Sequence, residues 1–184
     1  MKDLIVLAAE IQQLLETEDR QFCFIGGLAL LHWGEPRMTQ DLDIVVFSES
    51  SRNDSCLDVL LKHYTSRVDE PRELASEKGV LLLQSAKGIG VDIALGSIRY
   101  EALVVQRSRN VEFGANAQLK ICSAEDLVIY KAIANRSRDW LELNSIRIRQ
   151  VDLDWNYILR ELKPLVEAKG NLDIYKRVEI LADS

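Results

Sequence analysis

The 184-residue sequence has few of the side chains that form disulfides or bind transition metals. It contains three cysteines, Cys23, Cys56 and Cys122, and two histidines, His32 and His63. The number of cysteines is odd, their spacing is wide and no Cys-x-x-Cys pair occurs, so neither a disulfide framework nor a zinc site is expected. Two histidines give little support to a histidine-based metal site.

Long hydrophobic runs and an excess of positive charge are also missing. No apolar run approaches the roughly 20 residues of a membrane-spanning helix, and the first residues enter an amphipathic pattern that contains Glu10, unlike a signal peptide. The formal net charge is −6, which argues against broad, charge-driven binding of nucleic acid but leaves room for RNA at one local basic face. We therefore expect a cytoplasmic protein without a membrane contact.

The remaining composition, 47% hydrophobic and 28% charged, is that of an ordinary globular protein. Strand-like apolar segments and helical periodicities alternate before residue 123, and only helical periodicities follow it. The expected strands are 22–25, 41–47, 79–84 and 90–95, with weaker candidates at 111–113 and 119–121. The expected helices are 3–17, 28–33, one around 57–61, 98–107, 124–135, 137–149, 154–168 and 171–182.

These patterns predict an α/β (α+β) fold in two regions. Residues 1–122 form the α/β core, in which 79–84 and 90–95 pair as an antiparallel hairpin. Residues 123–184 form a C-terminal helical bundle that packs on the core. Ser123 is expected to cap the first helix of that bundle, with Glu125 and Asp126 in its first turn.

Three aspartates carry the chemistry that the sequence predicts. Asp41 and Asp43 are two apart on an expected strand, so both carboxylates face the same side while Leu42 and Ile44 enter the core. Carboxylates this close repel each other, and a divalent Mg²⁺ or Mn²⁺ ion compensates their charge. Asp92, on the apolar strand 90–95, joins them if the two strands are neighbours.

Each of these features also has a purely structural interpretation. Asp-x-Asp on a strand is more often a solvated edge than a metal site, and Asp92 is equally well a salt-bridged acid. Gly26 and Gly27 read as a strand-to-helix turn, which also lets backbone N–H groups approach a phosphate.

The combined order of motifs is more specific than any one of them. Phe24-Ile25-Gly26-Gly27, then Arg37-Met38-Thr39-Gln40-Asp41-Leu42-Asp43-Ile44, then Val91-Asp92-Ile93 resembles the DNA polymerase beta superfamily of nucleotidyltransferases. Arg-x-Thr-x-Asp-x-Asp is similar to its minimal branch, which includes the AbiEii-type toxins of bacterial toxin–antitoxin systems. The segments 123–131 and 136–139 resemble the later motifs of that branch, so the resemblance covers about residues 22–140.

The resemblance implies a nucleotidyltransferase-like mixed sheet with flanking helices, and it implies a role for each motif residue. The metal ligands and catalytic acids would be Asp41, Asp43 and Asp92, with Asp92 also accepting the proton of the attacking hydroxyl. The nucleotide-binding residues would be Gly26, Gly27, Arg37, Thr39, Lys131 and Asp139. From the residues alone, Lys131 is more often a surface lysine. Arg136, Arg138 and Asp139 could instead form a salt-bridged helix corner, and Arg37 and Thr39 could simply shape a loop.

The implied function is metal-dependent transfer of a nucleoside monophosphate from an NTP such as ATP to an acceptor hydroxyl. RNA and protein are the favoured acceptors, a small molecule is a third, and an antitoxin partner is open. The alternative is a catalytically inactive nucleotide-binding or partner-binding module of the same fold, and a third interpretation is a structural or interaction protein. The complete set of acids favours the enzyme.

Overall fold

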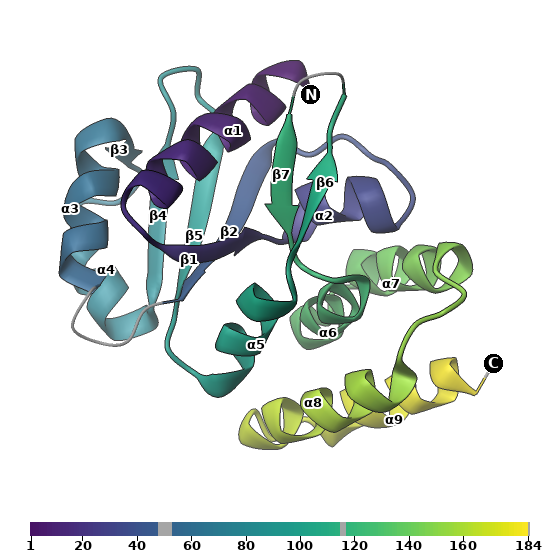
Figure 1. The fold of residues 1–184 in the computed structure, drawn as a ribbon. Coiled ribbons are helices and arrows are strands. Elements are labelled where there is room, and N and C mark those ends of the chain that lie inside the picture. The colour runs from purple at the N-terminus through teal and green to yellow at the C-terminus, as the bar shows by residue number, and fades with distance from the viewer. Residues whose placement is uncertain (48–52, 115–116, 184) are drawn as a thin grey trace. The chain divides into compact units, whose positions relative to one another are not determined.

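The computed structural model describes residues 1–47, 53–114 and 117–183, and its contacts divide the chain into two compact units (Figure 1). Unit 1 contains Met1–Leu28 and Arg37–Cys122, and unit 2 contains Ala29–Pro36 and Ser123–Ser184. Helix α2 (Gly26–Trp33) starts in unit 1 and ends in unit 2. The expected packing of a region 123–184 on a core of 1–122 stays a prediction.

Unit 1 is built on one mixed sheet. Its described strands run in the order β3-β4-β5-β2-β1-β7-β6. The pairs β2–β5 and β1–β7 are parallel, and the other neighbours are antiparallel. The strands are β1 (Gln21–Phe24), β2 (Asp41–Phe47), β3 (Thr65–Ser66), β4 (Val80–Gln84), β5 (Gly90–Gly96), β6 (Arg109–Glu112) and β7 (Gln118–Ile121). The other helices of this unit are α1 (Lys2–Thr17), α3 (Asn53–His63), α4 (Pro71–Lys78) and α5 (Arg99–Arg107).

Alternation along β2 decides which face of the sheet is apolar. Leu42, Ile44 and Val46 are fully buried on one face, whereas Asp41 is exposed and Asp43 half-buried on the other. Helix α1 packs against β1, β2 and β7 through its buried apolar residues. Its Gln12 side-chain amide also bonds the β7 backbone: it donates to Gln118 O and accepts from the Lys120 N–H. Hydrophobic burial therefore orients the sheet so that the aspartates face away from the apolar side.

The sequence prediction missed β3 and α4. β3 has only two residues, both polar, so it has no detectable period. α4 has the sequence PRELASEK and buries only Ala75, which leaves no apolar stripe. Its boundaries were readable, because Pro71 stands at the start and Gly79 ends the helix in the left-handed conformation at φ 64°.

Unit 2 is helical and consists of the end of α2 with α6 (Ala124–Ala134), α7 (Ser137–Arg149), α8 (Trp155–Ala168) and α9 (Leu172–Ala182). α6 contacts α7, α8 and α9, and α8 contacts α9. Ser123 caps α6 as predicted, because its Oγ accepts from the Asp126 N–H at 3.1 Å. The Asp126 carboxylate is fully buried and accepts from Ser123 Oγ and from Tyr157 Oη, each at 2.7 Å.

The predicted α/β class, the mixed sheet, the hairpin of β4 with β5 and the helical C-terminal region are confirmed. Among the helices of the described ranges, none is long and apolar enough to cross a membrane.

The buried pair of Tyr157 and Asp126 predicts a stability effect. Tyr157→Phe removes the hydroxyl donor and leaves one oxygen of the fully buried Asp126 carboxylate without this bond. We therefore expect the free energy of unfolding to fall by about 1–3 kcal/mol. Urea denaturation of the full chain measures the difference. Tyr175→Phe, at a part-exposed position of α9, is the control, and equal losses in the two variants would contradict the role of the bond.

Candidate active site

The parallel pairing of β2 with β5 brings the three predicted aspartates to one face of unit 1. Asp43 lies directly opposite Asp92 in the register, and Asp41 lies opposite Gly90. Because side chains alternate along both strands, all three carboxylates project from the same face. Asp41, Asp43 and Asp92 together form the acid group. The neighbour relation that the sequence left open for Asp92 is therefore confirmed.

Two glycines make room for the β1–α2 turn against this face. A Cβ at Gly26 would overlap Asp43 Oδ2, and Gly26 has the left-handed φ of 57°. A Cβ at Gly27 would overlap Thr39 Oγ1. The Gly27 N–H donates to Asp43 Oδ2 at 3.4 Å, so one of the three carboxylates faces the positive end of α2.

Asp92 is held by an arginine that the sequence prediction did not select. Arg67 Nη2 donates to Asp92 Oδ1, and the two side chains are 32% and 40% exposed. Burial raises the pKa of Asp92 and the Asp41 charge adds to this, while the Arg67 charge and hydrogen bond act in the opposite direction; the net pKa is above the ordinary value. Asp92 is therefore salt-bridged, and it also lies with Asp41 and Asp43 on one face of the sheet.

The acid group suits a divalent cation in donor chemistry and in register. Three carboxylates supply the oxygen ligands that Mg²⁺ and Mn²⁺ prefer. Within the described ranges, however, no three acidic, histidine or cysteine side chains are already gathered as a metal cluster. Asp43 faces the start of α2 and Asp92 faces Arg67, so the carboxylates need side-chain rotation to share one ion.

The loop before β2 holds Arg37 and Thr39 in unit 1. Thr39 Oγ1 donates to the Asp41 carbonyl at 3.2 Å, and Arg37 Nη1 donates to the Met38 carbonyl at 2.9 Å. Thr39 therefore joins Gly27 and Asp41 in one contact group. The structural interpretation, in which both residues shape the loop, accounts for these two bonds.

Lys131 and Asp139 meet in unit 2. The Lys131 side chain is 7% exposed, and its ammonium lies 2.6 Å from Glu142 Oε2 and 3.3 Å from Asp139 Oδ1. Asp139 also accepts from Arg136 Nε at 2.6 Å. Burial acts to raise the pKa of Asp139, but the Arg136 hydrogen bond and the Lys131 charge outweigh it, so the pKa is lowered.

This arrangement changes the interpretation of Lys131. It is a buried lysine with two carboxylate partners rather than a surface lysine. The salt-bridged corner expected for Arg136, Arg138 and Asp139 is present, with Arg138 Nε donating to Glu142 Oε1 at 3.1 Å.

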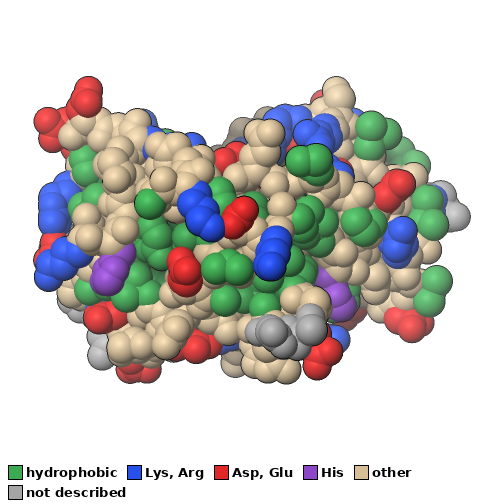
Figure 2. Space-filling model, turned by 90° about the horizontal axis from the view of Figure 1, so that it is seen from above, with side chains coloured by type: hydrophobic (Ala, Val, Ile, Leu, Met, Phe, Trp, Pro, Cys, Tyr) green, Lys and Arg blue, Asp and Glu red, His purple; other side chains and the backbone are tan. Residues whose placement is uncertain are grey.

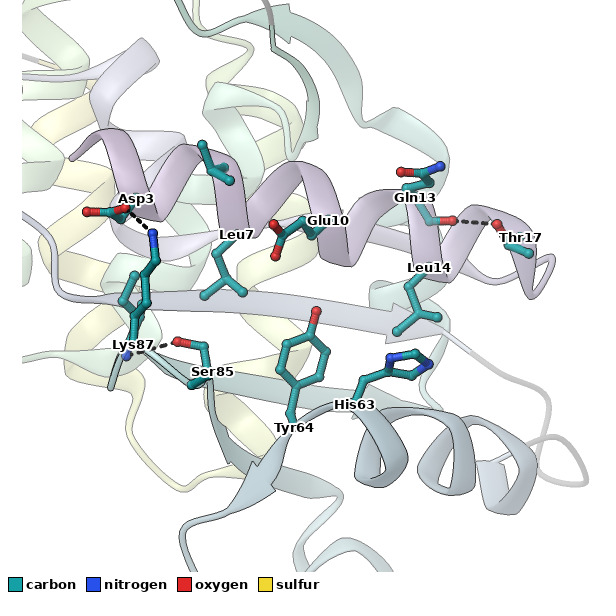
Figure 3. A pocket seen from close by; sticks show the side chains of 13 residues that line it. Asp3, Leu7, Glu10, Gln13, Leu14, Thr17, His63, Tyr64, Ser85 and Lys87 are labelled. Atoms are coloured by element: carbon teal, nitrogen blue, oxygen red, sulfur yellow. Dashed lines mark hydrogen bonds and ion pairs between the residues drawn. The ribbon is translucent and has the colours of Figure 1, made fainter.

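A hollow of about 550 Å³ in unit 1 is lined by none of the predicted site residues. Figure 3 shows it between α1 and the end of α3, with Leu7 and Leu14 above Tyr64 and His63. Its wall includes Ile89, the residue before β5, and none of the three aspartates. The hollow therefore lies away from the predicted site residues.

Sequence reasoning missed Arg67 and Gly90. Arg67 follows the two-residue strand β3, whose polar sequence carries no period, so no local signal placed it near Asp92. Gly90 had a weak signal, because a glycine opening an apolar strand marks a close approach of other groups. In the structure, a Cβ at Gly90 would overlap Asp41 Oδ1 and lie 3.4 Å from Arg67 Nη1.

The Gly26 geometry predicts a loss of stability on Gly26→Ala that exceeds the ordinary cost of a left-handed alanine. That cost is about 1–2 kcal/mol, and displacement of Asp43 should add about 1–3 kcal/mol. Gly79→Ala is the matched control, because Gly79 has a φ of 64° in the same unit and its Cβ would meet only Leu95 O at 3.5 Å. Urea unfolding compares them, and equal losses would contradict the Asp43 contact.

The Asp92 environment predicts a titration. Asp92 should titrate above the ordinary aspartate pKa, and Arg67→Gln should raise its pKa further, because the favourable charge on the carboxylate is lost. Carboxyl ¹³C NMR of ¹³C-aspartate-labelled protein in EDTA measures both values, and Asp92→Asn identifies the resonance. A lower pKa in Arg67→Gln would show that the two groups do not interact in this way.

Solved structures with a similar fold include a nucleotidyltransferase-like protein and an adenylyltransferase. An antigenic nucleotidyltransferase-like protein from Paracoccidioides brasiliensis has a TM-score of 0.54 at 16% identity, covering 96% of this chain and 93% of its own. The antibiotic-resistance factor ANT(2'')-Ia has a TM-score of 0.59 at 13% identity, with coverages of 96% and 98%. Lincomycin-bound lincosamide antibiotic adenylyltransferase LnuA has a TM-score of 0.52 at 12% identity, with coverages of 75% and 92%.

At these identities the structural likeness is one of fold. No curated protein sequence matches the chain significantly. The family model of the nucleotidyl transferase AbiEii toxin, type IV TA system, matches residues 12–151. This match includes both the aspartate strands and the Lys131–Asp139 segment, and the chain therefore belongs to the AbiEii nucleotidyltransferase family.

Proposed function

We propose that this nucleotidyltransferase transfers a nucleoside monophosphate from an NTP to an acceptor hydroxyl in a reaction that depends on Mg²⁺ or Mn²⁺. The observation that supports the proposal is the register of β2 with β5, which places Asp43 opposite Asp92 with Asp41 on the same face. Repelling carboxylates on a half-exposed face are costly for a purely structural surface, and a cation gives them a use.

The three aspartates would hold the cation. When bound, it would align the triphosphate and stabilise the charge that develops on the leaving pyrophosphate. Asp92 is the candidate acceptor for the proton of the attacking hydroxyl, because it lies opposite Asp43 on this face and its pKa is raised. Asp41 and Asp43 would act as further ligands, Asp43 where α2 begins and Asp41 over Gly90.

The β1–α2 turn would bind the triphosphate. Gly26 and Gly27 start α2 and carry no side chain toward Asp43 and Thr39, so an anion can approach the backbone N–H groups of the helix start. The long 3.4 Å bond from Gly27 N–H to Asp43 is readily exchanged for a phosphate oxygen. Thr39 and Arg37 line the adjacent loop and are candidates for further phosphate contacts.

Lys131 and Asp139 would serve the nucleotide from α6 and α7. The carboxylates of Asp139 and Glu142 hold the Lys131 ammonium in one position, so a nucleotide phosphate would have to replace one of these partners to contact it. Asp139 is thus a candidate positioning residue for Lys131, and Lys131 is the candidate contact to a nucleotide phosphate.

RNA or protein is the acceptor class that we propose, together with a role in a toxin–antitoxin pair. The description of the matching family as an AbiEii toxin of a type IV TA system supports this role. Figure 2 shows Lys and Arg side chains interspersed with Asp and Glu on the face it displays, and the net charge is −6. An RNA acceptor would therefore be held at a few local contacts rather than along a broad basic surface.

The proposal predicts that transfer requires the acid group. Wild-type protein incubated with labelled NTPs, Mg²⁺ and either total RNA or cell-extract protein should give a labelled product, and Asp43→Asn should lower its rate by about 100-fold or more, since charge stabilisation of several kcal/mol is lost. Gel electrophoresis followed by mass spectrometry locates the label. EDTA should abolish the reaction in the wild type.

The matched control is Asp152→Asn, which removes an exposed carboxylate outside this face and should leave transfer unchanged. Transfer that survives Asp43→Asn would contradict the assignment of the acids. Nucleotide binding without transfer to RNA, protein or small-molecule acceptors would favour the inactive module instead.

A further inference from the structure

Arg67 lies in the same row of the sheet as the catalytic-site aspartates. The register places Asp43 opposite Asp92 on β5, and Asp92 opposite Leu82 on β4. β3 pairs Ser66 with Leu83, and the Arg67 N–H donates to the Leu82 carbonyl at 2.9 Å, which continues the row by one residue. Four neighbouring chain segments therefore carry Asp43, Asp92, Leu82 and Arg67 side by side on one face.

The guanidinium reaches across Leu82 to the acids. Arg67 Nη2 donates to Asp92 Oδ1. Gly90 is the neighbour of Asp41 in the next row, and the space over its missing side chain holds Asp41 Oδ1 with Arg67 Nη1 at its edge, 3.4 Å from the Cβ position. Arg67 thus faces two of the three carboxylates that the proposed function assigns to a cation.

The contact opposes the binding of a metal ion to the same carboxylate, because the guanidinium places a positive charge beside Asp92 and occupies one lone pair of its Oδ1. Arginine remains protonated and can only donate hydrogen bonds, so it cannot itself become a ligand of the ion. The pair is nevertheless a weak one, because the Arg67 and Asp92 side chains are 32% and 40% exposed and water screens ion pairs at such positions. A divalent cation that binds three carboxylates can therefore displace it.

We propose that Arg67 is a built-in counter-ion of the acid group, which neutralises Asp92 and Asp41 in the metal-free protein and competes with the divalent cation for them. The proposal rests on the proposed metal dependence. It makes loading of the site an exchange, in which the guanidinium leaves Asp92 as the cation arrives. Arg67 is a positioning residue in this role, since it acts through the carboxylates.

Binding of Mn²⁺ to the full chain in the absence of nucleotide tests the competition, with free Mn²⁺ measured by electron paramagnetic resonance. Arg67→Gln should bind Mn²⁺ about fivefold or more tightly than the wild type, because no guanidinium has to leave Asp92 when the ion binds. Arg67→Lys, which keeps the charge, should stay near the wild type. Asp43→Asn in the Arg67→Gln background should abolish the binding, which locates it at the acid group.

Arg72→Gln is the matched control. Arg72 forms an exposed pair with Asp58 in the same unit, so its loss changes the net charge equally and should leave Mn²⁺ affinity unchanged. Melting of each variant in EDTA verifies that it is folded.

Three outcomes would overturn the inference. They are equal Mn²⁺ affinity of Arg67→Gln and the wild type, equal tightening in Arg72→Gln, and absence of Mn²⁺ binding from both the wild type and Arg67→Gln. The labelled-NTP transfer assay decides the proposed function separately. An active, EDTA-sensitive wild type whose Mn²⁺ affinity is indifferent to Arg67 would retain the function and remove only the counter-ion role.

Discussion

The parallel register of β2 with β5 is the constraint on which the candidate site depends. It sets Asp43 directly opposite Asp92, although like charges opposite each other in a sheet are unfavourable. The other face of the same strands resolves the conflict, because Leu42 and Ile44 are fully buried there. A slip of one residue would turn these side chains out of the core, so apolar burial holds the acids together.

Unit 1 compensates the acids by several local means. The start of α2 faces Asp43, and Arg67 donates to Asp92. Glycines at 26, 27 and 90 leave open the space into which Asp43, Thr39 and Asp41 project. Neither charge contact is deeply buried, so each can be exchanged for a ligand at a modest cost. The contacts that stabilise the three carboxylates without a cation would therefore also set the affinity of this face for a cation.

Unit 2 treats its charges differently. Lys131, Asp139 and Glu142 are all less than 10% exposed in their side chains and satisfy one another. Removing one member of such a cluster would leave a buried charge without compensation, which is far more costly than breaking a surface pair. The family match covers this segment as well as the aspartate strands. The buried charge cluster of unit 2 and the half-exposed carboxylates of unit 1 therefore both lie within the matched residues.

Local sequence determined the elements whose signal lies within a few residues. The alternation of Leu42, Ile44 and Val46 with Asp41 and Asp43 predicted β2 with its exact bounds, and the Ser123 cap and the hairpin of β4 with β5 followed from short-range patterns. The family resemblance, now confirmed, added the fold and the chemistry that the residues alone left open.

Only the tertiary structure decided which side chains meet. Arg67 is 25 residues from Asp92 in the sequence, and it reaches the acids because β3, β4, β5 and β2 stand in one register. Lys131 looked like a surface lysine until its two carboxylate partners were placed. The physical reason is the same for both: strand register and helix packing bring distant residues together, and each is set by burial on the far side of the element rather than by the charged residues themselves.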